Sequence, residues 1–108
     1  NDHVRNYVTM INLAVGLGLT DPGTHTCFFV VPGGSHTDGQ ELTDVNWFAA
    51  ITNWVEKDIA PEQMVYNKRD TTTGAVLRTL PVCRHPQYPR YNGAGDVNAA
   101  ASFTCTTP

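Results

Sequence analysis

The chain has 108 residues, of which 41% are hydrophobic and 16% are charged, and its formal net charge is −3. This length allows at most one small domain with a modest core. The basic residues form no cluster that could neutralise phosphates, so nucleic acid and anionic membranes are poor candidate partners. No apolar run is long enough to span a membrane, and the first residues do not resemble a signal peptide.

The first predicted element is a helix over residues 4–15, where apolar residues recur at spacings of three and four. These positions are Val4, Tyr7, Val8, Ile11, Ala14 and Val15. Gly16 and Gly18 end the helix, and an Asp-Pro-Gly sequence at residues 21–23 predicts a turn. Residues 27–31, Cys-Phe-Phe-Val-Val, then predict a short buried strand. A helix followed by such a strand is typical of the second half of a βαβ unit.

A Pro-Gly-Gly sequence at residues 32–34 stops this strand, and His36 follows on the loop. In open α/β sheets, ligands bind beyond the carboxyl ends of the strands, so His36 is a candidate general base. The alternative is a solvated loop histidine, which is the more common case for a histidine in such a position.

A second helix is predicted after a polar loop, capped by Thr43 or Asp44 and ending before the Ala-Pro sequence at residues 60–61. Its apolar positions are Val45, Trp47, Phe48, Ile51, Trp54 and Val55. The two tryptophans lie on this stripe and are interpreted as core residues, with a stacking platform for a ligand as the alternative.

Two short extended segments follow, residues 64–66 and 76–80, joined by a turn at residues 71–74. One central strand and two amphipathic helices do not make a self-sufficient layer, because a buried parallel strand needs neighbours on both edges. We therefore expect an incomplete α/β fold that pairs with upstream sequence or with another polypeptide. The absence of an initiator Met before Asn1 agrees with a piece of a longer protein.

The three cysteines are an odd number, which in a secreted protein leaves one of them unpaired within the chain. Cys83 and Cys105 flank a segment with several prolines and glycines and little apolar periodicity, where a disulfide would replace a missing core. Two reduced cysteines in a cytosolic protein are the alternative. A zinc site is disfavoured because no C-x-x-C pattern is present.

Several motifs carry a family resemblance, and they occur at residues 31–36 (VPGGSH), 54–57, 60–61, 78–83, 86–87, 91–96 and 100–105. In this order they resemble the C-terminal region of the tannase and feruloyl esterase family, over most of the chain. That family consists of secreted α/β-hydrolase serine esterases that cleave esters of phenolic acids, and it includes enzymes that act on terephthalate monoesters. The resemblance also implies that Cys83 and Cys105 form the family's C-terminal disulfide.

The resemblance further implies a Ser-His-Asp triad in which His36 is the base and Asp2 is the acid that orients it. From the residues alone, Asp2 could equally be an acidic residue that caps the first helix. No Gly-x-Ser-x-Gly elbow is present, and neither Ser35 nor Ser102 lies in that context. The nucleophile, the oxyanion hole and the substrate-binding lid are therefore expected in upstream sequence.

The chain departs from the family pattern at Thr37, where the family has a cysteine that bonds to a cysteine beside the nucleophile. Cys27 then has no obvious partner in this chain, and we expect it to pair with upstream sequence or with a companion chain.

The sequence therefore predicts that residues 1–108 are the C-terminal segment of one α/β-hydrolase domain, closed at residues 83–105 by a disulfide. The whole protein is predicted to be a secreted or periplasmic serine esterase for aromatic or phenolic acid esters, inactive as this chain alone. Its partners are the aromatic ester and the polypeptide with the nucleophilic serine. No cofactor is predicted here, because calcium in this family is held in the lid. A non-catalytic binding or scaffold protein of the same fold is the alternative, motivated by Thr37.

Overall fold

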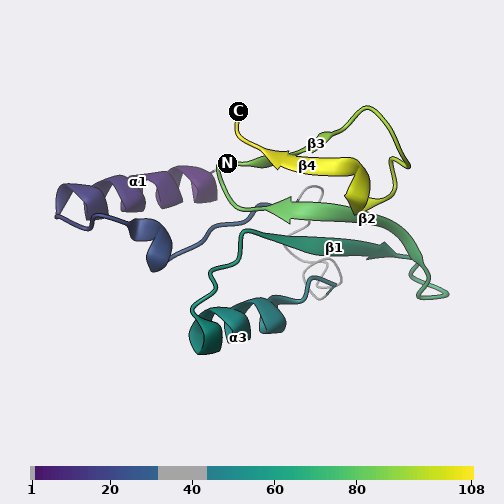
Figure 1. Cartoon of the computed structure of the whole chain (residues 1–108), viewed down its shortest axis with the longest axis horizontal. Helices are drawn as coiled ribbons and strands as arrows, with labels where there is room; N and C mark the ends of the chain where they lie inside the picture. The colour runs from purple at the N-terminus through teal and green to yellow at the C-terminus, as the bar shows by residue number, and fades with distance from the viewer. Residues whose placement is uncertain (1, 32–43) are drawn as a thin grey trace.

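The computed structural model describes residues 2–31 and 44–108 as a mixed arrangement of helices and strands (Figure 1). In chain order the elements are α1 (Asp2–Gly16), the 3-10 helix η1 (Pro22–Thr24), α3 (Trp47–Lys57), β1 (Gln63–Arg69), β2 (Val76–Cys83), β3 (Tyr88–Tyr91), the 3-10 helix η2 (Ala100–Ser102) and β4 (Phe103–Thr106). The described strands form two antiparallel pairs, β1 with β2 and β3 with β4. No helix within these two ranges has the length and apolarity needed to cross a membrane.

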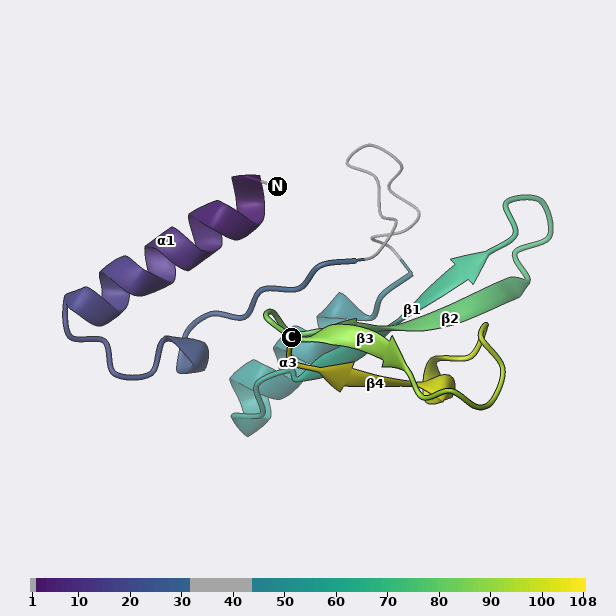
Figure 2. The same cartoon turned by 90° about the horizontal axis from the view of Figure 1, so that it is seen from above.

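The predicted first helix is confirmed as α1, which starts two residues earlier and ends one residue later than its apolar stripe. Seen from above, α1 lies to one side of the two strand pairs, and residues 17–31 connect it to them (Figure 2). The ring of Tyr7 stacks on Phe28 with centroids 4.9 Å apart, and both rings meet His85 edge-on. This aromatic cluster therefore links α1 to the residues that follow β2.

The buried strand predicted over residues 27–31 is wrong. Only Phe29 forms a β-bridge, and it is antiparallel to Arg84. The His85 N–H also donates to the Phe28 carbonyl over 2.7 Å, while Val30 is 43% exposed. An apolar, β-branched run becomes a buried strand only where neighbouring strands satisfy its backbone groups on both sides. Within the described ranges this segment has such a neighbour on one side.

The second helix is present, but its predicted start is wrong. Its cap is Asn46, whose side-chain oxygen accepts from the Ala49 N–H over 3.1 Å. Val45 is drawn into a β-bridge with Tyr66, so the helix cannot begin before that point. The other predicted cap, Thr43, lies outside the described residues. The helix ends as predicted before the Ala-Pro sequence, at Asp58 in the left-handed conformation (φ 55°).

The two extended segments predicted after this helix are confirmed as an antiparallel hairpin of β1 and β2. The Asp70 carboxylate closes the turn by accepting from the Thr72 and Thr73 N–H groups, each over 2.8 Å. The core lies on one face of the hairpin, where Val45, Tyr66 and Val82 are buried and Val82 is fully enclosed. Phe29, Val31, Trp47, Met64 and Leu80 pack around these three residues.

The C-terminal tail forms the second strand pair, which lies beside β2 (Figure 1). Thr79 connects the two pairs, because its N–H donates to the Asn98 carbonyl over 2.8 Å and its hydroxyl accepts from Ala100 over 2.7 Å. Cys83, at the end of β2, and Cys105, in β4, form a disulfide with their Cα atoms 5.6 Å apart. The predicted pairing is thus confirmed, and the tail is attached to β2 at the middle of the strand and at its carboxyl end.

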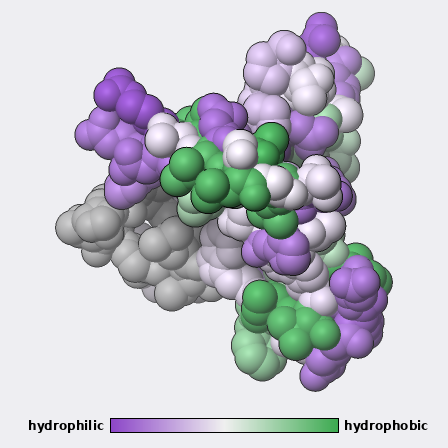
Figure 3. All heavy atoms as spheres, turned by 90° about the vertical axis from the view of Figure 1, so that its left-hand side faces the viewer, coloured by the Kyte–Doolittle hydropathy of each residue, from purple (hydrophilic) through white to green (hydrophobic). Residues whose placement is uncertain are grey.

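The predicted core stripe of the second helix is only partly packed. Trp47 and Trp54 are partly buried, as expected of core residues. Phe48 is 80% exposed, Val55 77% and Ile51 50%, which contradicts the prediction for these three residues. The face on which α1 and α3 lie carries two areas of apolar surface (Figure 3). The described residues therefore leave Phe48 and Val55 largely uncovered and cover about half of Ile51.

The disulfide gives the first testable prediction, made for the natural protein that contains this chain. It closes a loop with a sequence separation of 22, for which loop-closure entropy gives about 3 kcal/mol. Replacing Cys83 and Cys105 by serine should lower the free energy of urea unfolding by about that amount. Each single replacement should cost as much as the double, because either one removes the bridge. An unchanged unfolding free energy in the double variant would contradict this.

Candidate active site

The two predicted triad residues are not brought together by the described residues. Asp2 is exposed in the first turn of α1, where the free N–H groups of the helix favour a negative charge. His36 lies outside the residues that the structure describes, as do Ser35 and Thr37. The pairing of Asp2 with His36 therefore stays a prediction, and the alternative for Asp2, a helix-terminal charge, agrees with its position.

The structure describes the residues on either side of the segment that contains His36. On the amino-terminal side, Phe29 and Val31 pack against the core of the hairpin. On the carboxyl-terminal side, Val45 is part of that core and Trp47 packs against it. The rings of Phe29 and Trp47 meet edge-on with centroids 6.3 Å apart. The chain thus enters and leaves the segment that contains His36 at neighbouring points of one hydrophobic core.

Cys27 has no disulfide partner among the described residues and is partly buried. It lies at an apolar hollow of about 160 Å³. The hollow is lined by Cys27, Phe29, Trp47, Ala50, Ile51, Trp54, Pro61 and Met64. Burial raises the pKa of the Cys27 thiol, Arg84 partly opposes the rise, and Glu62 adds to it. Such surroundings favour the neutral thiol and a low reactivity.

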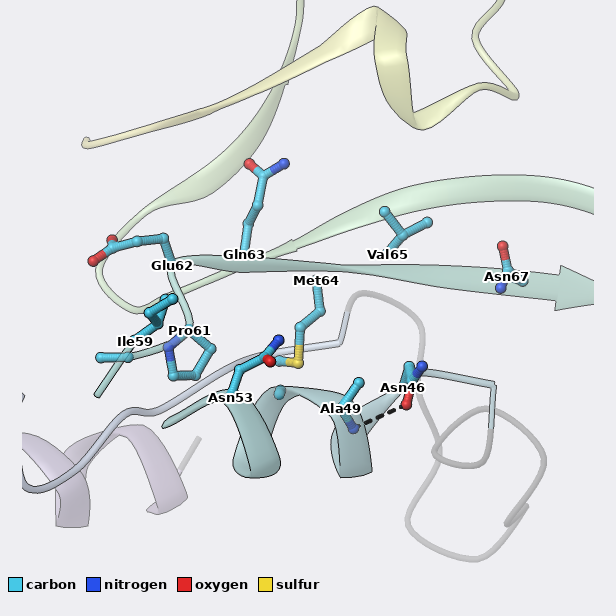
Figure 4. A pocket seen from close by; sticks show the side chains of 12 residues that line it. Asn46, Ala49, Asn53, Ile59, Pro61, Glu62, Gln63, Met64, Val65 and Asn67 are labelled. Atoms are coloured by element: carbon cyan, nitrogen blue, oxygen red, sulfur yellow. Dashed lines mark hydrogen bonds between the residues drawn. The ribbon is translucent and has the colours of Figure 1, made fainter. Parts of the chain in front are cut away.

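A larger groove of about 580 Å³ lies between α3 and β1 (Figure 4). In Figure 4 the Met64 side chain points toward α3 and Asn53, whereas Gln63 and Val65 point away from the helix. The lining holds asparagine amides and the Glu62 carboxylate but no histidine, serine or cysteine, so it offers neither a serine or cysteine nucleophile nor an imidazole base. Among residues 2–31 and 44–108, no group of three or more His, Cys, Asp or Glu side chains could hold a metal ion.

Sequence reasoning missed the contacts that attach the segment before His36 to the hairpin. The Arg84 guanidinium donates from Nη2 to the Gly23 carbonyl over 3.0 Å, across 61 residues of chain. His85 carried no signal in the sequence, yet it completes the aromatic cluster of Tyr7 and Phe28. Neither contact follows from local spacing, because each joins parts of the chain that only the fold brings together.

Comparisons with known proteins extend this description. The model of the family described as "Tannase and feruloyl esterase" matches residues 15–106. The mono(2-hydroxyethyl) terephthalate hydrolase of Piscinibacter sakaiensis is 36% identical over 96 residues, which cover 85% of this chain and 16% of the relative. A probable feruloyl esterase of Arthroderma benhamiae is 39% identical over 82 residues, which cover 71% of this chain and 15% of the relative. The chain thus spans about a sixth of the length of these relatives.

A solved structure shares the fold. The crystal structure of an esterase from Aspergillus oryzae superposes with a TM-score of 0.75 at 24% identity, and the match covers 98% of this chain and 24% of that one. The structure of feruloyl esterase B from the same organism matches 56% of this chain with a TM-score of 0.50 and 26% identity.

The surroundings of Cys27 give a second prediction. If the thiol is free in the natural protein, its raised pKa lowers the thiolate fraction at pH 8 relative to the unfolded chain, so iodoacetamide should modify it more slowly. The rate should then rise about tenfold per pH unit until the pH reaches the raised pKa. Modification would be followed by mass spectrometry of the Cys27 peptide, with the urea-unfolded protein as control. Equal rates in both states would contradict the prediction. If Cys27 reacts only after treatment with a reductant, this would instead support the expected disulfide to upstream sequence.

Proposed function

Because this chain belongs to the tannase and feruloyl esterase family of carboxylic ester hydrolases, we propose that it is the C-terminal portion of a serine esterase for aromatic or phenolic acid esters. The observation that carries the proposal is the family match over residues 15–106, which include His36. Two relatives support the substrate class, since one is named a mono(2-hydroxyethyl) terephthalate hydrolase and the other a probable feruloyl esterase.

In the proposed mechanism His36 is the general base. A serine hydroxyl attacks an ester only when a neighbouring imidazole accepts its proton, and the imidazole then returns that proton to the leaving alcohol. A carboxylate fixes the imidazole tautomer and stabilises the imidazolium, a role that we assign to Asp2. Water repeats the sequence on the acyl-enzyme and releases the aromatic acid.

The remaining parts of the site belong to sequence outside these 108 residues. We place the nucleophilic serine, the oxyanion hole and the substrate-binding lid there, together with any calcium that the lid holds. The exposed apolar side chains of α3, above all Phe48 and Val55, support this arrangement, because contiguous exposed apolar surface marks an interaction site. The shared fold points the same way, since the chain superposes on only 24% of the Aspergillus oryzae esterase.

A secreted or periplasmic location is part of the proposal. The disulfide between Cys83 and Cys105 supports it, because structural disulfides persist mainly in oxidising compartments. The competing proposal is a non-catalytic binding or scaffold protein of the same fold. Thr37 favours it, because the family's cysteine at this place pins the histidine loop to the nucleophile.

Replacing His36 by alanine separates the two proposals. In the natural protein that contains this chain, His36→Ala should lower kcat for methyl ferulate by a thousandfold or more, the scale expected of a triad member. His25→Ala is the matched control, because His25 is an exposed histidine at the end of η1. Equal kcat values in the two variants would contradict the esterase mechanism and favour the scaffold.

The role of Asp2 has its own test. If Asp2 orients His36, Asp2→Asn should lower kcat by about 10⁴-fold while leaving KM nearly unchanged. Asp58→Asn is the control, since Asp58 is exposed and its backbone adopts the left-handed conformation, which asparagine also tolerates. If Asp2→Asn behaves like the control in kcat and only lowers the Tm slightly, Asp2 is a helix-terminal charge and the triad acid lies elsewhere.

A further inference from the structure

Two cations lie opposite each other on the β1–β2 hairpin, next to its hydrophobic core. The hairpin pairs Tyr66 with Leu80 and, one pair closer to the turn on the same face, Lys68 with Arg78. Tyr66 is buried, and Leu80 packs against the same core. Because side chains alternate between the two faces of a strand, Lys68 and Arg78 continue the core face as a cation pair.

The cation pair has an unmet need for an acceptor and for negative charge. The Nε atom of Arg78 is buried and donates to no acceptor in the part of the chain that the structure describes. A buried donor without a partner is rare in folded proteins and costs free energy. Lys68 cannot relieve it, because an ammonium group only donates, and like charges directly opposite each other on a hairpin repel.

The acidic side chains closest along the chain are bound elsewhere. The Arg69 Nε donates to both carboxylate oxygens of Asp44, over 3.1 and 3.0 Å. The Asp70 carboxylate accepts from two N–H groups of the hairpin turn, each over 2.8 Å, and these bonds lower its pKa. Of the ion pairs within the described part of the chain, none includes a member of the cation pair.

From these observations we propose that Lys68 and Arg78 form a binding site for a carboxylate group. A guanidinium presents Nε–H and Nη–H as a fork that matches the two oxygens of a carboxylate, and the ammonium of Lys68 adds a further donor. One carboxylate thus gives Nε an acceptor and balances both cations. A water molecule would give Nε an acceptor but would leave the repulsion in place. The proposal does not depend on the proposed esterase function.

The carboxylate has two possible sources, an Asp or Glu side chain of the protein and a small acid in solution. Carbodiimide cross-linking of the natural protein that contains this chain tests the first source. The reagent activates a carboxylate, and a lysine amine in contact with it then forms an amide. Lys68 should be joined to one acidic residue, identified by mass spectrometry of the digested protein. Lys57, an exposed lysine in the last turn of α3, is the internal control for random cross-linking.

The dependence on Arg78 shows whether the cross-link reports the site. Arg78→Met should lower the yield of the Lys68 cross-link about tenfold, because it removes hydrogen bonds to a charged group. Arg90→Met, which removes an exposed cation from β3, is the matched control and should leave the yield unchanged. Arg78→Lys keeps the charge but not the fork and should recover part of the yield. This milder variant keeps the test valid if Arg78→Met does not fold.

A thermal melt tests the second source. If a small acid fills the site, sodium acetate should raise the Tm above that in sodium chloride of equal ionic strength, and the rise should grow with the logarithm of the acetate concentration. Arg78→Met should abolish this rise, and Arg90→Met should keep it. A Lys68 cross-link whose yield is the same in Arg78→Met would overturn the proposal, as would the lack of both a Lys68 cross-link and an acetate effect.

Discussion

The antiparallel pairing of β1 and β2 supports the other described parts of the chain. Val82, fully enclosed on the core face of this hairpin, packs with Tyr66 and with Val45 from the residues before α3. The residues that follow β2 extend its influence, since His85 contacts the aromatic ring of Tyr7 in α1 and Cys83 bonds to the C-terminal tail. A small core of this kind can hold several segments in place because close packing and backbone hydrogen bonds act on the same few residues.

The same arrangement leaves a packed core on the hairpin and exposed apolar side chains on α3. The disulfide joins the hairpin to the C-terminal tail, whereas the side chains of Phe48 and Val55 in α3 are largely exposed. A helix that presents apolar side chains on both sides is suited to lie between two layers. The proposed esterase divides its chemistry accordingly, with the base on this chain and the nucleophile on the layer that would cover it.

Elements set by local pattern could be predicted from the sequence, and those set by distant contacts could not. α1 and the hairpin follow from helical spacing and from the Thr-Thr-Thr-Gly turn, both of which are readable over a few residues. The predicted start of α3 is wrong because Val45 pairs with Tyr66, 21 positions away. The strand predicted over residues 27–31 is wrong because the bridge partner of Phe29 is the distant Arg84. His36 could be proposed from its motif, whereas the Arg84 contact to Gly23 spans 61 residues and left no local signal.

The most direct test of the account is to find which serine reacts with a serine-hydrolase inhibitor. The natural protein that contains this chain would be treated with a fluorophosphonate, digested and mapped by mass spectrometry. We predict one labelled serine outside residues 1–108, in a Gly-x-Ser-x-Gly context. A label on Ser35 or Ser102, or no label on a protein that nevertheless hydrolyses methyl ferulate, would contradict the claim that this chain supplies the base to a nucleophile carried elsewhere.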